Sequence, residues 1–127
     1  MINDVTKAFM LEKYYVSKND YIENEIDNKN YVAISKMPTD INGVKFRVSL
    51  FFSNNELVRV MLVAIDMQDN EKYIGKPTKE IHNNWLIENF GKSYKEKIYG
   101  ISYKFDDIKI SSEHDPRSLS DHIIIDY

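Results

Sequence analysis

Residues 43–66, which read GVKFRVSLFFSNNELVRVMLVAID, decide the fold. In GVKFRVSLFF the apolar positions recur at every second residue, which predicts a half-buried β-strand. SNNE, residues 53–56, then supplies turn residues that tolerate unusual backbone angles. The segment that follows alternates again but is apolar on its second face as well, so we predict a β-hairpin whose second strand is central. The predicted inner face consists of Val44, Phe46, Val48, Leu50 and Phe52 on one strand and Val58, Val60, Leu62 and Ala64 on the other.

A helix is predicted after this hairpin, in TKEIHNNWLIENFG, residues 78–91. Thr78 is a suitable N-cap, Ile81 and Trp85 share one helical face, and Gly91 is a typical helix stop. Near the N-terminus, residues 3–13 are compatible with a second, short helix. The polar stretch between residues 14 and 30 is interpreted as irregular, with a strand at its start as the alternative.

The C-terminal third alternates apolar and polar residues over 99–105 and 108–111, and the chain ends in HIIIDY. EHDPRSLSD, residues 113–121, is interpreted as a loop that joins the last two strands, because Pro116 presets a turn. No internal repeat is visible. We therefore predict one α+β domain, residues 1–127. Its antiparallel sheet has about five strands, and one main helix, at about 78–90, packs on one face.

Composition excludes several classes of protein. The chain has 127 residues, no cysteine and a net charge of −3. The lack of cysteine excludes disulfides and thiolate chemistry and fits a reducing compartment, so we expect a cytoplasmic protein. No basic stripe suggests nucleic-acid binding. No apolar run is long enough to span a membrane or serve as a secretory signal.

The polar stretch SSEHDPRSLSD, residues 111–121, invites a catalytic interpretation. Ser112, His114 and Asp115 are near neighbours in sequence, and such neighbours rarely converge on one point as a nucleophile, base and orienting group must. We therefore predict no enzyme activity and no catalytic residue. The spacing of candidate metal ligands matches no zinc or calcium motif, so we expect no metal and no cofactor. Those ligands are His82, His114, Asp115, Asp121 and His122.

Acidic residues are concentrated near the C-terminus. Residues 106–127 hold six acidic and two basic side chains, and residues 18–30 are also acidic. Such a surface would favour a basic protein partner. We therefore expect a non-enzymatic protein-binding module, with an acidic loop surface formed by Asp106, Asp107, Asp115 and Arg117. For Arg117, a salt bridge to a neighbouring carboxylate is the simpler alternative.

Two other functions stay open. Trp85, Tyr99 and Tyr103 are predicted to face the space between sheet and helix, where they could line an aromatic pocket of a small-ligand-binding protein or minor enzyme. An aromatic core is the simpler explanation of the same pattern. Pairing of the terminal strands of two copies would instead form a homodimer.

The pattern WLIENFG at 85–91, then SSEHDPRS at 111–118, then alternating isoleucines that end in tyrosine resembles a group of small single-domain proteins from low-GC bacteria. Some of these are similar to immunity proteins, which sit beside toxins and block them. The resemblance covers roughly residues 43–127 and implies an immunity-type inhibitor with no catalytic residues. The residues that carry it are Trp85, Leu86, Gly91, Ser112, Asp115, Arg117, Ser118, Ile123, Ile125 and Tyr127.

Overall fold

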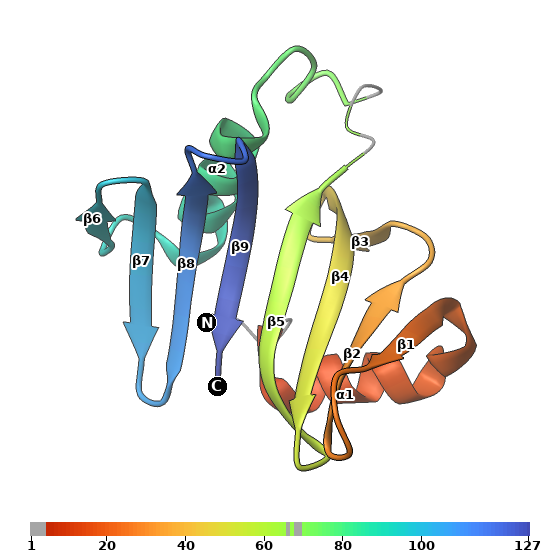
Figure 1. Cartoon of the computed structure of the whole chain (residues 1–127). Helices are drawn as coiled ribbons and strands as arrows, with labels where there is room; N and C mark the ends of the chain where they lie inside the picture. The colour runs from red at the N-terminus through yellow and green to blue at the C-terminus, as the bar shows by residue number, and fades with distance from the viewer. Residues whose placement is uncertain (1–4, 66, 68–69) are drawn as a thin grey trace.

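The computed structural model describes residues 5–65, 67 and 70–127. One antiparallel sheet contains all nine described strands, in the order β1-β2-β4-β5-β9-β8-β7-β6, with β3 beside β4 (Figure 1). The elements are α1 (Lys7–Val16), the 3-10 helix η2 (Lys18–Asp20), β1 (Tyr21–Glu25), β2 (Asn30–Ser35), β3 (Thr39–Ile41), β4 (Val44–Ser53), β5 (Glu56–Ala64), α2 (Thr78–Phe90), β6 (Lys95–Lys97), β7 (Gly100–Phe105), β8 (Ile108–Asp115) and β9 (Ser120–Asp126).

The predicted α+β fold with about five strands is therefore wrong, because the protein is mostly sheet. The prediction missed β1, β2, β3 and β6. The outer strands β1 and β6 are polar and largely exposed, so they lack the alternation that marks a half-buried strand. In β2, apolar residues occupy both faces, and the short β3 offers too few residues for a pattern.

The sheet consists of two halves with the same connectivity. In each half a helix precedes a meander: α1 precedes β1, β2, β4 and β5, and α2 precedes β6 to β9. The halves meet where β5 pairs with β9, with Val60 opposite Ile125 and Leu62 opposite Ile123. The C-terminal strand is thus central rather than at an edge, so it cannot pair with a second copy.

Both helices pack on the same face of the sheet. On α1, Tyr14 lies with its ring centroid 5.4 Å from that of Phe52. On α2, Trp85 makes an edge contact with Phe46, at 5.1 Å, and its indole N–H donates to the carbonyl of Ile41 at 2.9 Å. The core therefore lies between this face and the two helices. The sheet face that points at the viewer in Figure 1 is covered by no described helix.

The central hairpin forms as predicted, with one local difference. A β-bulge places Leu57 opposite Phe52 and Arg59 opposite Phe51, which leaves Val58 unpaired. Leu57 is buried and Val58 is 37% exposed, so Leu57 takes the inner position that the alternation had assigned to Val58.

The helices also differ in detail from the prediction. α2 covers the predicted range, but Pro77 rather than Thr78 is its N-cap. α1 begins after Thr6, whose hydroxyl accepts a hydrogen bond from the amide of Phe9, and it ends at Val16 rather than at residue 13. The predicted start of this helix, residues 3 and 4, lies outside the described residues.

The loop predicted at 113–121 is only a tight turn. β8 extends to Asp115 and β9 begins at Ser120, so residues 116–119 form the connection. Asp115 accepts a hydrogen bond from the amide of Arg117 at 2.9 Å, as expected for an aspartate before a turn. Leu119 completes the turn in the left-handed region, with φ of 56°.

Candidate functional site

The open face of the sheet carries an apolar stripe. Strand register places its members opposite one another on adjacent strands, for example Ile22 with Ile34, and Met61 with Ile124. Phe51 lies on β4, opposite Val32 of β2, and Val63 lies on β5, two residues after Met61. We call this set the apolar stripe: Ile22, Val32, Ile34, Phe51, Met61, Val63 and Ile124.

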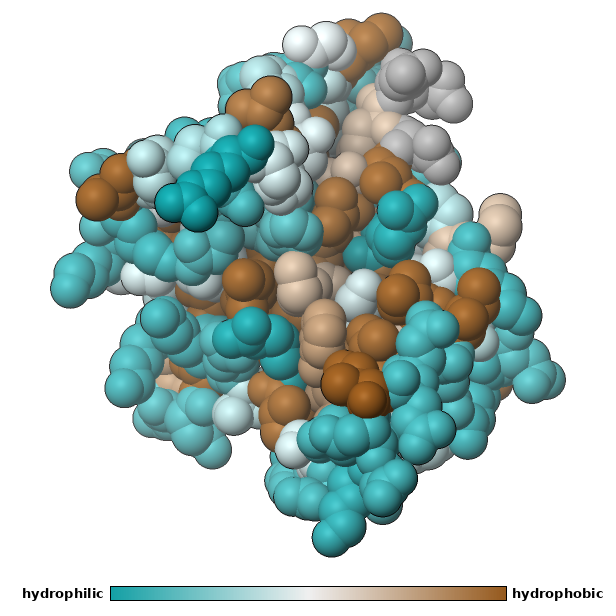
Figure 2. Space-filling model, viewed as in Figure 1, coloured by the Kyte–Doolittle hydropathy of each residue, from teal (hydrophilic) through white to brown (hydrophobic). Residues whose placement is uncertain are grey.

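No residue of the apolar stripe belongs to the core or packs against it. Each is partly or largely exposed, and hydrophobic side chains gather in the middle of this face in Figure 2. An antiparallel sheet that has one face in water normally shows polar residues there. A contiguous apolar patch with a polar rim is instead typical of a surface that meets a partner.

Cationic side chains flank the apolar stripe. By register, the open face carries seven Lys or Arg and five Asp or Glu side chains, a net charge of +2, whereas the whole chain carries −3. The cations are Lys45, Arg47, Arg59, Lys95, Lys97, Lys104 and Lys109, and the acids are Asp40, Glu56, Glu113, Asp115 and Asp126.

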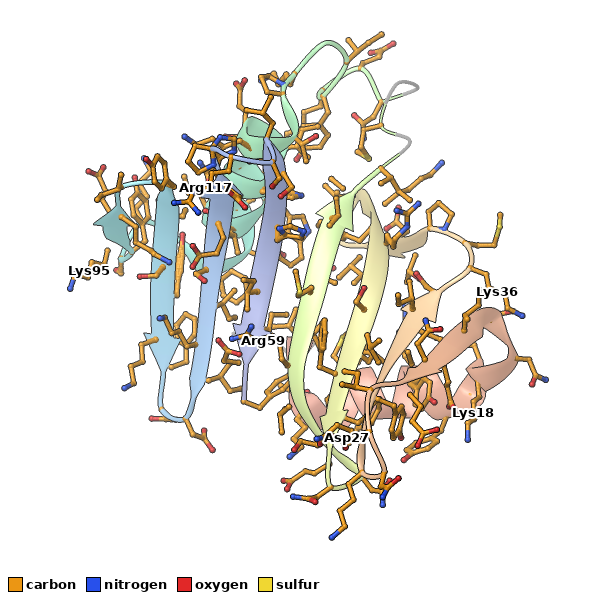
Figure 3. The ribbon with its side chains drawn as sticks, in the orientation of Figure 1. Lys18, Asp27, Lys36, Arg59, Lys95 and Arg117 are labelled. Atoms are coloured by element: carbon orange, nitrogen blue, oxygen red, sulfur yellow. The ribbon has the colours of Figure 1, made fainter. Side chains whose placement is uncertain are left out.

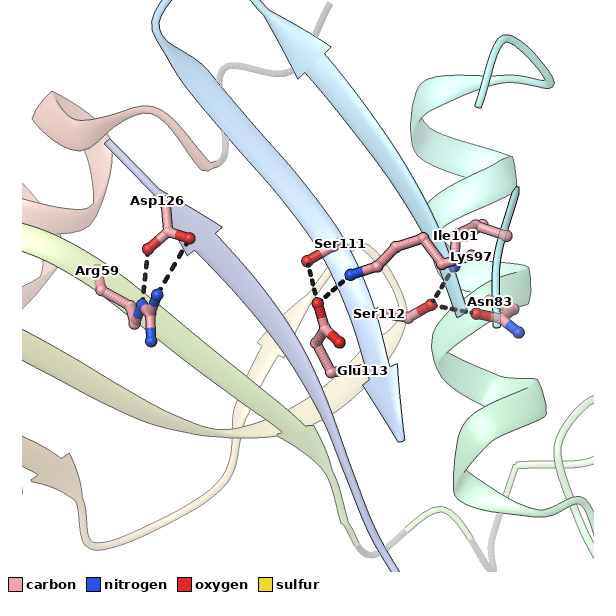
Figure 4. Close-up of polar contacts among 8 residues, drawn as sticks. All are labelled: Arg59, Asn83, Lys97, Ile101, Ser111, Ser112, Glu113 and Asp126. Carbon is pink, nitrogen blue, oxygen red and sulfur yellow. Dashed lines mark hydrogen bonds and ion pairs between the residues drawn. The ribbon is translucent and has the colours of Figure 1, made fainter. Parts of the chain in front are cut away.

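Two of these cations are held by acids of the same face (Figure 4). The guanidinium of Arg59 donates to both carboxylate oxygens of Asp126, at 2.6 and 3.2 Å, across the β5–β9 junction. Lys97 pairs with Glu113, which also accepts a hydrogen bond from Ser111. Within the described residues the other five cations form no ion pair, so they are available to a partner.

The residues predicted to form an acidic loop surface are not brought together. Asp106 and Asp107 lie at the turn between β7 and β8, whereas Asp115 and Arg117 lie at the turn after β8. At about 3.3 Å per residue, the length of β8 separates the two pairs by more than about 20 Å. Figure 3 shows Arg117 at the end of the sheet where β8 and β9 are joined.

Other acids of the C-terminal segment are dispersed over both faces. Glu113 and Asp126 are paired on the open face, while Asp121 lies on the helix side, where its carboxylate accepts a hydrogen bond from His114 Nδ1 at 2.7 Å. The salt bridge considered for Arg117 does not form with any described residue. Its backbone amide, together with Ser118, lowers the pKa of Asp115.

The proposed pocket residues divide between core and surface. Trp85 is fully buried, and Tyr103 is buried with its hydroxyl donating to the carbonyl of Gly91 at 2.7 Å. Phe90 lies between them and contacts both rings. Tyr99 is exposed on the turn before β7, where its ring approaches His114. Trp85 and Tyr103 are therefore parts of an aromatic core, and Tyr99 does not join them in one wall.

A hollow of about 230 Å³ lies elsewhere, between the end of β5 and the start of α2. It is open to solvent, and Tyr73, Lys76 and Ile81 are among its walls. None of the three predicted pocket residues lines it.

His82 is a titratable group buried between α2 and the sheet. Its Nε2 accepts a hydrogen bond from the amide of Ala64 at 2.9 Å, so the neutral ring carries its proton on Nδ1. Nδ1 has no hydrogen-bond partner among the described residues. Burial lowers the pKa of His82 to about 4, against the smaller opposing effect of the Asp121 charge. His82 is thus a neutral core residue at neutral pH.

Ser112, His114 and Asp121 of the 111–121 stretch likewise form hydrogen bonds within the fold. Ser112 donates to Asn83 Oδ1 at 2.6 Å and accepts the amide of Ile101 at 3.0 Å (Figure 4). His114 is paired with Asp121. In the part of the chain that the structure describes, no three His, Asp or Glu side chains lie close enough to hold a metal ion.

Sequence reasoning missed the open face as a site, although one signal was present. The outward positions of the second hairpin strand are apolar, and this was interpreted as partial cover on both sides of a central strand.

No described helix is long and apolar enough to cross a membrane. Comparison of the chain with family models, curated proteins and solved structures gives no match.

Proposed function

We propose that the protein is a non-enzymatic protein-binding module that docks through the open face of its sheet. The observation that carries this proposal is the apolar stripe, which has a polar rim and no cover from any described helix. Binding would bury the apolar stripe, and the flanking cations would orient the partner.

The cations favour a partner with acidic groups around an apolar centre. Lys45 and Arg47 on β4 are unpaired among the described residues and lie beside the apolar stripe, with Arg47 opposite Val63. The unpaired Lys109 and Lys104 lie opposite each other farther along the same face, on β8 and β7. Single-stranded nucleic acid would also meet these charges, but it needs aromatic side chains on which bases stack. Phe51 is the one aromatic residue of the apolar stripe, so a protein partner is favoured.

An immunity-type inhibitor in the cytoplasm is one role for such a module. The resemblance described above supports it, as does the absence of cysteine from the chain. Half of the ten residues that carry the resemblance are buried, Trp85, Ile123 and Ile125 among them, and these five support a shared fold rather than a shared site.

The proposal is tested by site-specific photocrosslinking in lysate of the source cells. A photoreactive residue at Met61, on the open face, should crosslink to one protein, whereas the same residue at Lys79, on the exposed side of α2, should not. With that protein purified, Met61→Glu should weaken binding at least tenfold, because a charge would be buried at the centre of the interface. Equal crosslinking from both positions, or a nuclease-sensitive product, would refute the proposal.

A further inference from the structure

The two edges of the sheet differ in how they are protected. β6 has only three residues, two of which are lysines, and short edge strands with lysine discourage pairing with another chain. β1 is longer, and two isoleucines are exposed there: Ile22, within the strand, by 52%, and Ile26, just after it, by 63%. In Figure 1, β1 lies at the outer border of the sheet with no strand beyond it.

The hydrogen bonds of β1 show which backbone groups point outward. The amide of Lys36 donates to the carbonyl of Asp20, and the amide of Ile26 donates to the carbonyl of Asn30, each at 2.8 Å. Both pairs belong to the uninterrupted register of β1 with β2. Because hydrogen-bonded pairs alternate in an antiparallel ladder, the even-numbered residues from 20 to 26 bond to β2.

The odd-numbered residues Glu23 and Glu25 therefore direct their N–H and C=O groups away from the sheet, and Tyr21 directs its C=O outward. The N–H of Tyr21 donates instead to the carbonyl of Lys18. No described residue pairs with the outward groups of Glu23 and Glu25. They form a regular row of donors and acceptors at the spacing that an added strand requires.

The side chains of β1 specify what kind of strand would fit. Glu23 and Glu25 lie on the helix side, and on the open side Ile22 continues the apolar stripe. Glu25 has no ion pair among the described residues, whereas Glu23 accepts a hydrogen bond from Tyr14 and lies 3.8 Å from Lys18. A strand added here would place alternate residues beside the glutamates and the others beside the isoleucines.

We infer that β1 receives an extended segment of the protein partner in which basic and apolar residues alternate. This inference rests on the proposed function, since it adds a strand to the same binding surface. It also gives a role to the acidic side chains of residues 18–30, because Glu23 and Glu25 lie on the edge strand β1 that would receive the basic segment. Pairing of β1 with β1 of a second copy is disfavoured, because glutamates would face glutamates.

The test uses a nine-residue peptide that alternates lysine and valine, with a peptide that alternates glutamate and valine as its control. The basic peptide should bind and should slow hydrogen exchange at the amides of Glu23 and Glu25. The amides of Ile22 and Asn24, which already bond to β2, should change little. Absence of this alternating protection at millimolar peptide, or equal binding of the acidic peptide, would overturn the inference.

Two proline variants distinguish the outward N–H groups of β1 from those that hydrogen-bond to β2. Glu25→Pro removes an outward N–H and should weaken peptide binding at least tenfold while the protein stays folded. Glu25→Gln removes only the charge, so it should weaken binding of the basic peptide two- to fivefold, and only at low salt. Asn24→Pro removes an N–H that bonds to β2, so it should lower the melting temperature instead. Unchanged peptide affinity in Glu25→Pro would refute strand addition.

The outcomes also distinguish this inference from the proposed function. If Met61→Glu abolishes binding of the partner and Glu25→Pro does not, the proposed docking through the open face stands and the inference of strand addition at β1 is wrong. A partner that is kept with Met61→Glu and lost with Glu25→Pro would show binding at the edge alone. Light scattering that shows dimers sensitive to Glu25→Pro would assign the edge to a second copy and overturn the inference.

Discussion

Acid should destabilise the fold through His82, and the structure supplies the magnitude. The ring is buried in the core, accepts a hydrogen bond from Ala64 and has a pKa lowered from 6.5 to about 4. Protonation would place an unpaired charge in the core and would convert the accepting Nε2 into a donor that faces another donor. The folded protein therefore resists protonation that the unfolded chain accepts.

The sign and size of the effect follow from linkage. Between pH 6.5 and about 4 the unfolded chain binds more protons than the folded protein, so the free energy of unfolding falls as pH falls through this window. Above pH 6.5 the contribution is fully present. A difference of this size in pKa amounts to about 3 kcal/mol. Since a domain is stable by about 5–15 kcal/mol, the loss is a large part of the total.

Urea denaturation at a series of pH values measures this effect, and His82→Gln is the matching variant. Glutamine is able to accept from the Ala64 amide but does not titrate, so the variant should lose most of the slope between pH 6.5 and 5. Carboxyl groups whose pKa is lowered in the folded protein, such as those of Glu56 and Asp115, change the free energy of unfolding only at lower pH. His122→Gln, on the open face, should keep most of the slope, because burial is the main cause of the lowered pKa of His82 and the His122 charge is a smaller one. A flat wild-type profile, or an unchanged slope in His82→Gln, would refute the reasoning.

Three further predictions concern the fold. Gly100→Ala should lower the free energy of unfolding by about 1–3 kcal/mol, because the added Cβ would lie 2.0 Å from the backbone oxygen of Ser112; a melting temperature equal to wild type would contradict this. Trp85→Phe keeps an aromatic ring but leaves a buried carbonyl without its donor, which should cost about 1–3 kcal/mol in urea denaturation; a cost near zero would show that the hydrogen bond is dispensable. A double-mutant cycle with Arg59→Ala and Asp126→Ala should give a coupling of about 0.2–1 kcal/mol that shrinks in high salt, since the pair is exposed; a salt-independent coupling would argue against a surface ion pair.

The parts of the fold predicted correctly are those in which one element has one buried face. β4 and β7 alternate because only their inner residues are buried, and α2 carries its apolar residues and its stop signal within its own sequence. β1 and β6 were missed because both of their faces are largely exposed. β2 was missed because both of its faces are apolar. In neither case does the sequence show a period of two.

The sequence by itself determined the central hairpin, the position of α2 and the absence of cysteine chemistry, because these depend on neighbouring residues or on composition. Only the tertiary structure decided which residues share a surface. It separates Asp106 from Arg117 along the length of β8 and places Trp85 in the core. It aligns Ile22, Phe51 and Ile124, which lie far apart in sequence, on one open face. The physical reason is that strand order and register arise from packing between distant segments, and no local pattern records them.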